Sequence, residues 1–97
     1  MRVIAKSALR EFWKSYPDAE QPLRAWHAEA KAAAWKTPAD AKAKYRSASI
    51  LRGGRVVFNI GGNKYRLVVK INYPFQVIYI RFLGTHREYD RIDAETV

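Results

Sequence analysis

The chain has 97 residues, enough for one domain with a single hydrophobic core. Its composition is 48% hydrophobic and 13% aromatic, which excludes an intrinsically disordered chain, and the lack of cysteine excludes disulfides and thiolate metal sites. We expect one domain over residues 1–97. We also expect a cytoplasmic protein without a membrane partner, because no apolar run approaches the ~20 residues of a membrane span and the N-terminus lacks a secretory signal.

The first half of the chain has the pattern of helices. Residues 2–5 contain two β-branched side chains and predict a short edge strand. Apolar residues then recur at helical spacing from Ala8 to Tyr16, with Ser7 as the expected N-cap and Pro17 as the stop.

Two more helix starts follow. Asp18 with Gln21 resembles a capping box that opens a second helix, whose apolar stripe includes Leu23, Trp26, Ala30, Ala33 and Ala34. The "TPAD" stretch at 37–40 predicts a third, short helix to about Tyr45, and residues 47–54 read as a connector.

The second half changes to the alternation of β-strands. The predicted strands are 55–60, 64–71 and 76–83. Gly61-Gly62 and "NYPF" at 72–75 predict the two hairpin turns, and residues 91–97 read as a frayed tail. We therefore predict an α+β fold, in which N-terminal helices pack on one face of a small antiparallel β-sheet and the other face is open.

Alternation assigns the strand residues to two faces. The set expected to meet the helices is Val56, Phe58, Ile60, Tyr65, Leu67, Val69, Ile71, Ile78, Ile80 and Phe82. The set expected on the open face is Arg55, Val57, Asn59, Lys64, Arg66, Val68, Lys70, Val77, Tyr79 and Arg81. Arginine, lysine and tyrosine side chains should therefore lie together on that open face.

The positive charge is concentrated in the same region. Lysine and arginine number 18 against 9 acidic residues, for a net charge of +9, and no acidic residue occurs between Asp40 and Glu88. Ten basic residues fall in that interval. This footprint favours a polyanionic partner, and basic groups interleaved with an aromatic suit RNA. A solvated basic face is the ordinary alternative.

The "LGTHREYD" stretch at 83–90 holds the titratable groups at the end of the basic strands. RNA cleavage without a metal needs a base, an acid and cations around the phosphate. His86 has an ordinary pKa near neutrality, and Tyr89 would share its face in a helical turn. His86 can equally be a cap residue, Tyr89 a packing residue, and Asp90 a counter-charge for a neighbouring arginine. We expect no metal site, and we interpret His27 as a partly buried structural residue.

Two blocks carry a resemblance to a known family. "VFNIGGNKYRLVVKI" and "VIYIRFLGTHREYD", in that order and spacing, resemble the HigB-type toxins of type II toxin–antitoxin modules, a branch of the RelE superfamily. The resemblance extends over nearly the whole chain, including "KTPADAKAKY". It implies a compact RelE-like α+β endoribonuclease that cleaves mRNA, in many members on the ribosome. It also implies a cognate helix-turn-helix antitoxin (HigA-like) that, with the toxin, binds operator DNA. From the residues themselves we expect no cofactor.

These observations together give the expected site. The catalytic candidates are His86, Tyr89, Arg66 and Arg81, and the RNA-binding candidates are Lys64, Lys70, Tyr79, Arg55 and Arg87. His86 is the favoured acid/base, with Tyr89 as a second proton-transfer or base-stacking group. Two other functions stay open: a non-catalytic RNA- or ribosome-binding module, and a protein whose charge complements an acidic partner chain.

Overall fold

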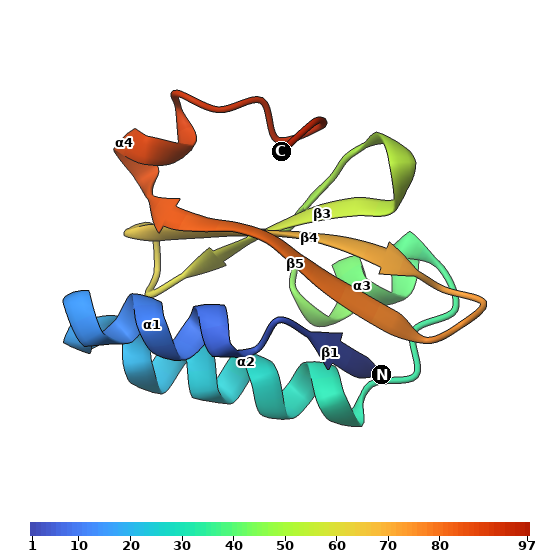
Figure 1. The fold of residues 1–97 in the computed structure, drawn as a ribbon. Helices are drawn as coiled ribbons and strands as arrows, with labels where there is room; N and C mark the ends of the chain where they lie inside the picture. The colour runs from blue at the N-terminus through green and yellow to red at the C-terminus, as the bar shows by residue number, and fades with distance from the viewer.

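The computed structural model describes residues 1–97 as a five-stranded sheet with helices on one face and the C-terminal segment on the other (Figure 1). The helical elements are α1 (Ser7–Ser15), the 3-10 turn η1 (Pro17–Ala19), α2 (Glu20–Ala32), α3 (Pro38–Lys44), the 3-10 turn η2 (Arg52–Gly54) and α4 (His86–Tyr89). The strands are β1 (Arg2–Ile4), β2 (Ser49–Ile50), β3 (Arg55–Ile60), β4 (Tyr65–Asn72) and β5 (Val77–Thr85). The α+β prediction is confirmed.

The sheet order is β1-β5-β4-β3-β2. Strands β3 to β5 form the expected antiparallel meander, and β1 lies at the edge as the predicted short strand. Residues 47–54, the predicted connector, contain the additional strand β2, which pairs antiparallel with β3. β1 pairs with β5 in parallel, so the sheet is mixed and not purely antiparallel. The first and last strands of the chain are therefore direct neighbours.

The two predicted hairpins are present. Gly61 and Gly62 have φ angles of +64° and +71° between β3 and β4, the left-handed region in which glycine carries no steric penalty. Tyr73–Gln76 form the β4–β5 turn, in which Asn72 accepts a hydrogen bond from the Phe75 main-chain N–H at 3.2 Å. These turns fix the register that brings β4 between its two partners.

The helix starts follow the sequence prediction only in part. At α3, Asp40 accepts hydrogen bonds from the main-chain N–H groups of Lys36 and Thr37, which confirms that start. Ser7 is the first residue of α1 and makes no capping hydrogen bond, so that N-cap prediction is wrong. The Asp18 capping box is also wrong, because Asp18 lies in the 3-10 turn and its carboxylate binds two side chains of the β3–β4 hairpin region.

The main core lies between the helices and the sheet. Leu23 and Trp26 of α2 are buried against Phe58, Leu67 and neighbouring strand residues. Phe58 is surrounded by aromatic rings, with centroids of Trp26 and Tyr45 at 5.5 and 5.1 Å. Burial of these large side chains supplies most of the driving force for packing helices on this face.

The second face of the sheet is not open, contrary to the prediction. Val57 and Val68 are 3% and 0% exposed, and they pack with Ala94 and the partly buried Phe82, Tyr89, Ile92 and Val97. We call this group the second cluster. Residues 91–97 therefore cover the middle of the sheet, and their assignment as a frayed tail is wrong.

A β-bulge explains the misassigned strand residue. Val68 pairs with Phe82 and Val69 pairs with Ile80, which leaves Arg81 as an extra residue in β5. Beyond the bulge the side chains exchange faces, so Phe82 joins the second cluster and Leu83 packs against the main core. Alternation alone placed Phe82 with the helices, which is wrong.

Candidate active site

Arg66 lies at the corner where the β3–β4 hairpin meets the end of β5. It pairs with Gly84 of β5, and its guanidinium donates to the main-chain oxygens of Asn63 and Tyr65 and to the Asn63 side-chain oxygen at 2.7 Å. Arg66 is only 8% exposed. The turn after Gly62 therefore holds this arginine in one orientation, with its charge retained at the corner.

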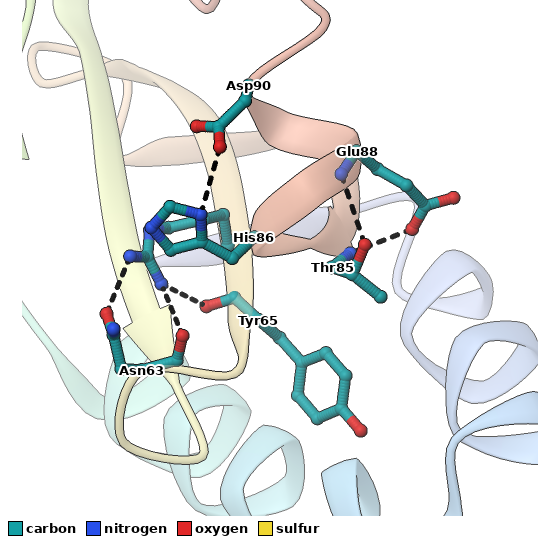
Figure 2. Close-up of polar contacts among 7 residues, drawn as sticks. Asn63, Tyr65, Thr85, His86, Glu88 and Asp90 are labelled. Atoms are coloured by element: carbon teal, nitrogen blue, oxygen red, sulfur yellow. Dashed lines mark hydrogen bonds and ion pairs between the residues drawn. The ribbon is translucent and has the colours of Figure 1, made fainter.

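His86 enters the same corner from β5. Its main-chain N–H donates to the Lys64 carbonyl, one residue beyond the last β4–β5 pair, and its Nδ1 lies 3.2 Å from an Asp90 carboxylate oxygen. Figure 2 shows His86 with Asp90 on one side and Asn63 of the turn on the other. The side chains of His86 and Asp90 are 47% and 60% exposed, so solvent and a substrate reach the imidazole.

Helix α4 is fixed by its own cap. The Glu88 main-chain N–H donates to the Thr85 hydroxyl, and the Glu88 carboxylate accepts from the Thr85 main-chain N–H (Figure 2). This reciprocal pair sets the helix start directly after the strand. His86 and Asp90 lie four residues apart, on the same side of the turn, which makes their pairing possible.

Tyr89 has a different environment from His86. Its ring is half-buried and packs in the second cluster with Val57 and Val68. Of the roles considered for Tyr89 from the sequence, packing therefore fits the environment of its ring. Tyr89 ties α4 to the sheet and so fixes the position of His86.

The other predicted residues form a second group at the far end of the sheet. Lys70 of β4 pairs with Arg55 on one side and Tyr79 on the other, four residues or about 13 Å along the strand from Arg66. Val68 and the C-terminal segment lie between the two groups. Lys70 and Tyr79 are exposed, whereas Arg55 is 8% exposed and donates to the main-chain oxygens of Ala94 and Val97.

Arg81, the bulge residue, does not lie with Arg66 and His86. Its Nε donates to the Val97 main-chain oxygen at 3.2 Å. It also lines a cavity of about 480 Å³ between α1 and β5, together with Glu11 and Glu88. The bulge and the C-terminal segment therefore separate Arg81 from Arg66, the other arginine among the catalytic candidates.

Lys64 and Arg87 flank the corner. Lys64 makes an ion pair of 2.8 Å with Asp18, whose carboxylate also accepts from the Tyr65 hydroxyl. These two partners lower the pKa of Asp18, and the carboxylate raises the pKa of Tyr65 to about 12. The contacts join the 3-10 turn after α1 to the hairpin. Arg87 is exposed in α4.

Sequence reasoning missed Asn63 and the role of Asp90. Asn63 follows the two turn glycines directly, and an amide at that place is able to reach back to a basic strand residue. Asp90 was considered only as a counter-charge for arginine, but its spacing of four residues from His86 within one helical turn already pointed to the observed pair.

With the fold and this corner described, comparison with protein families identifies the class as the RelE-like toxic component of a toxin–antitoxin system. The family model of the HigB toxins, which carries that description, matches residues 19–92, and the chain belongs to this family. The chain is 33% identical over 96 residues to the mRNA interferase toxin HigB of Escherichia coli strain K12, covering 97% of this chain and 92% of that protein. The mRNA interferase HigB of Escherichia coli O6:H1 is 23% identical over 94 residues, or 95% and 91% of the two chains.

The family assignment made from the two sequence blocks is therefore confirmed. No helix of the structure is both long and apolar enough to cross a membrane.

Proposed function

We propose that this protein is the toxin of a toxin–antitoxin pair and acts as an endoribonuclease on mRNA. The family membership supports the toxin role, and the relatives named mRNA interferase support the substrate. The observation that carries the chemistry is the corner itself, where the hydrogen-bonded Arg66 of β4 lies beside an accessible His86, which begins α4 directly after β5 and pairs with Asp90.

His86 is the proposed acid/base. Its pairing with Asp90 orients Nδ1 and leaves Nε2 for the substrate. In the reaction a base takes the proton of the 2′-hydroxyl, and the freed oxygen attacks the adjacent phosphorus. The bond from phosphorus to the 5′ oxygen then breaks, and that oxygen takes a proton. The products are a 2′,3′-cyclic phosphate and a 5′-hydroxyl.

Arg66 is the proposed electrostatic group. Its hydrogen bonds to the turn hold it before substrate arrives, so little reorganisation is needed when negative charge grows on the phosphate. Tyr89 supports the site by packing α4 against the sheet, and its hydroxyl is the second candidate for proton transfer or base stacking.

RNA would extend from this corner across exposed basic groups. We assign backbone contacts to Lys64 and Arg87 beside the corner, and to Lys70 and Tyr79 at the far end of the sheet. Arg55 drops out of this set, because its guanidinium is buried against the C-terminal segment. Arg81 contacts the same segment, so we assign it to holding the C-terminal segment on the sheet.

The proposed partners follow from membership of the toxin family. We propose a helix-turn-helix antitoxin as the inhibitor, operator DNA bound through the toxin–antitoxin complex, and ribosome-bound mRNA in the cytoplasm as the substrate. Net charge of +9 favours encounter with each nucleic acid and with an acidic inhibitor surface.

The decisive test uses purified proteins and mapped RNA ends. His86→Ala should reduce cleavage by about 10²- to 10⁴-fold, the range for a lost acid/base, and Arg66→Ala by a comparable factor. The control is Arg91→Ala, which replaces the exposed arginine that follows Asp90 and should keep full activity. Tyr89→Phe separates the hydroxyl from the ring: retained activity assigns Tyr89 to packing.

Two results would contradict the proposal. If His86→Ala, Arg66→Ala and the control all cleave equally, the corner is not the active site. If the wild-type protein binds RNA with a steep salt dependence but cuts no mRNA, with or without ribosomes, the protein is a non-catalytic RNA-binding module.

A further inference from the structure

Another set of basic side chains, distinct from those on the sheet, lies on the outer surface of the two long helices. Lys6 and Arg10 belong to the start and middle of the α1 segment, and Arg24, His27 and Lys31 follow one another along α2. All but His27 are exposed. We call this group, together with Arg2, the helical basic face.

The helical basic face is hollowed. A cavity of about 170 Å³ is lined by Lys6, Arg10, Arg24, His27, Leu9 and Trp13. A neighbouring cavity of about 300 Å³ shares Lys6 and His27 and adds Arg2 and Lys31. The two cavities form one shallow depression between α1 and β1 on one side and α2 on the other.

The charges in this depression are largely uncompensated. Arg2, Lys6, Arg10 and Lys31 make no ion pair with an acidic side chain; only Arg24 does, with Glu20 at 2.7 Å. The surrounding potential also acts on His27, whose pKa is lowered by burial and then by the positive charges of Lys6 and Lys31.

The spacing of the cations suits a phosphate backbone. Lys6 and Arg10 lie one helical turn or about 6 Å apart, and Arg24 to Lys31 spans about 10 Å. Trp13 is covered by the Arg24 guanidinium at 4.8 Å from its ring, and Leu9 is 2% exposed, so the depression offers no apolar anchor. Protein interfaces have apolar, charge-depleted centres, which makes a nucleic acid the better fit than a protein.

The helical basic face lies on the opposite side of the sheet from Arg66 and His86, because the helices pack on one face and α4 on the other (Figure 1). An RNA strand at the corner would therefore have to pass around the domain to reach the helical basic face. We propose that the helical basic face is a second RNA-binding site, which holds the phosphate backbone of a structured RNA separate from the strand at the candidate active site.

Binding to an RNA that resists cleavage tests this site independently of the nuclease proposal. The probe is a duplex of about 20 base pairs of 2′-O-methyl RNA, which lacks the attacking hydroxyl. The variant is Lys6→Gln, Arg10→Gln and Lys31→Gln combined. The matched control is Lys36→Gln, Arg46→Gln and Arg52→Gln, three exposed basic residues outside both sites with the same loss of charge.

The triple variant should bind the duplex about 10-fold or more weakly, and the slope of log K against log salt should fall by up to ~3, about one per lost phosphate contact. The control should change the affinity by less than ~3-fold, through net charge alone. Equal weakening in both variants would overturn the proposal, since it would show only a general charge effect. Unchanged RNA affinity, with loss of binding to an acidic protein partner, would overturn it in favour of a protein interface.

Discussion

Val68→Ala measures how firmly the C-terminal segment covers the sheet. Val68 is 0% exposed in the second cluster, and the substitution removes two methyl groups, worth ~1.6 kcal/mol at ~0.8 each. The cavity left behind adds about 1 kcal/mol. We expect a loss of about 2–3 kcal/mol of unfolding free energy, or a fall in Tm of about 10–20 °C for a domain of this size.

Equilibrium urea unfolding with two controls on the same strand is the assay. Val69→Ala is the same chemical change at a 0% exposed residue of the main core and should cost a similar amount. Lys70→Ala, at an exposed residue, should stay within about 0.5 kcal/mol of the wild type. If Val68→Ala behaves like Lys70→Ala, the second face is open in solution and the reasoning about the C-terminal segment fails.

Three further predictions concern the site, the pH dependence and the turn before β3. Asp90→Asn should lower RNA cleavage by about 10-fold, and less than His86→Ala, because it removes only the group that orients the imidazole; an equal or larger loss measured by initial rates would refute this order. Because the pKa of His27 is lowered in the folded protein, its stabilising contribution is complete above its ordinary pKa of 6.5 and is lost as the pH falls below that value. Tm should therefore decline on acidification through that range. If His27→Gln shows the same dependence of Tm on pH as the wild type, this prediction is wrong. Gly54→Ala should lower the free energy of unfolding by about 2–4 kcal/mol, because φ is +75° and the new Cβ would lie 2.7 Å from a β4 carbonyl oxygen. Gly53→Ala, where φ is +70° and the Cβ would enter open space, should lower it by only about 1 kcal/mol in the same thermal melts.

Local signals predicted most of the fold. The double glycine set the β3–β4 turn, and the Thr37–Asp40 start and the strands from Arg55 onward are where the sequence placed them. Each of these depends on residues close in the chain. The failures come from contacts between distant segments: Asp18 binds Lys64 instead of capping its own helix.

The bulge is the clearest case of a tertiary feature without a local signal. "VIYIRFL" alternates regularly, and nothing in it marks Arg81 as the extra residue. The bulge turns Phe82 toward Val57, Val68 and the C-terminal segment, which are distant from it in the sequence. The candidate site at 83–90 stays a prediction. The expectation of an open basic face was wrong in the middle of the sheet, because the cover over Val68 lies in residues that have no strong pattern of their own.

The parallel pairing of β1 with β5 also determines when the protein folds during its synthesis. Residues 2–4 find their partners only at 77–79, and the Arg66–His86 corner needs β5 and α4 as well. A sheet built from such distant pairings forms late and as a unit. A growing chain on the ribosome therefore exposes its strands but has no assembled corner until nearly all of it has emerged. If the corner cleaves RNA, the protein becomes harmful to its host only after its own translation is almost complete.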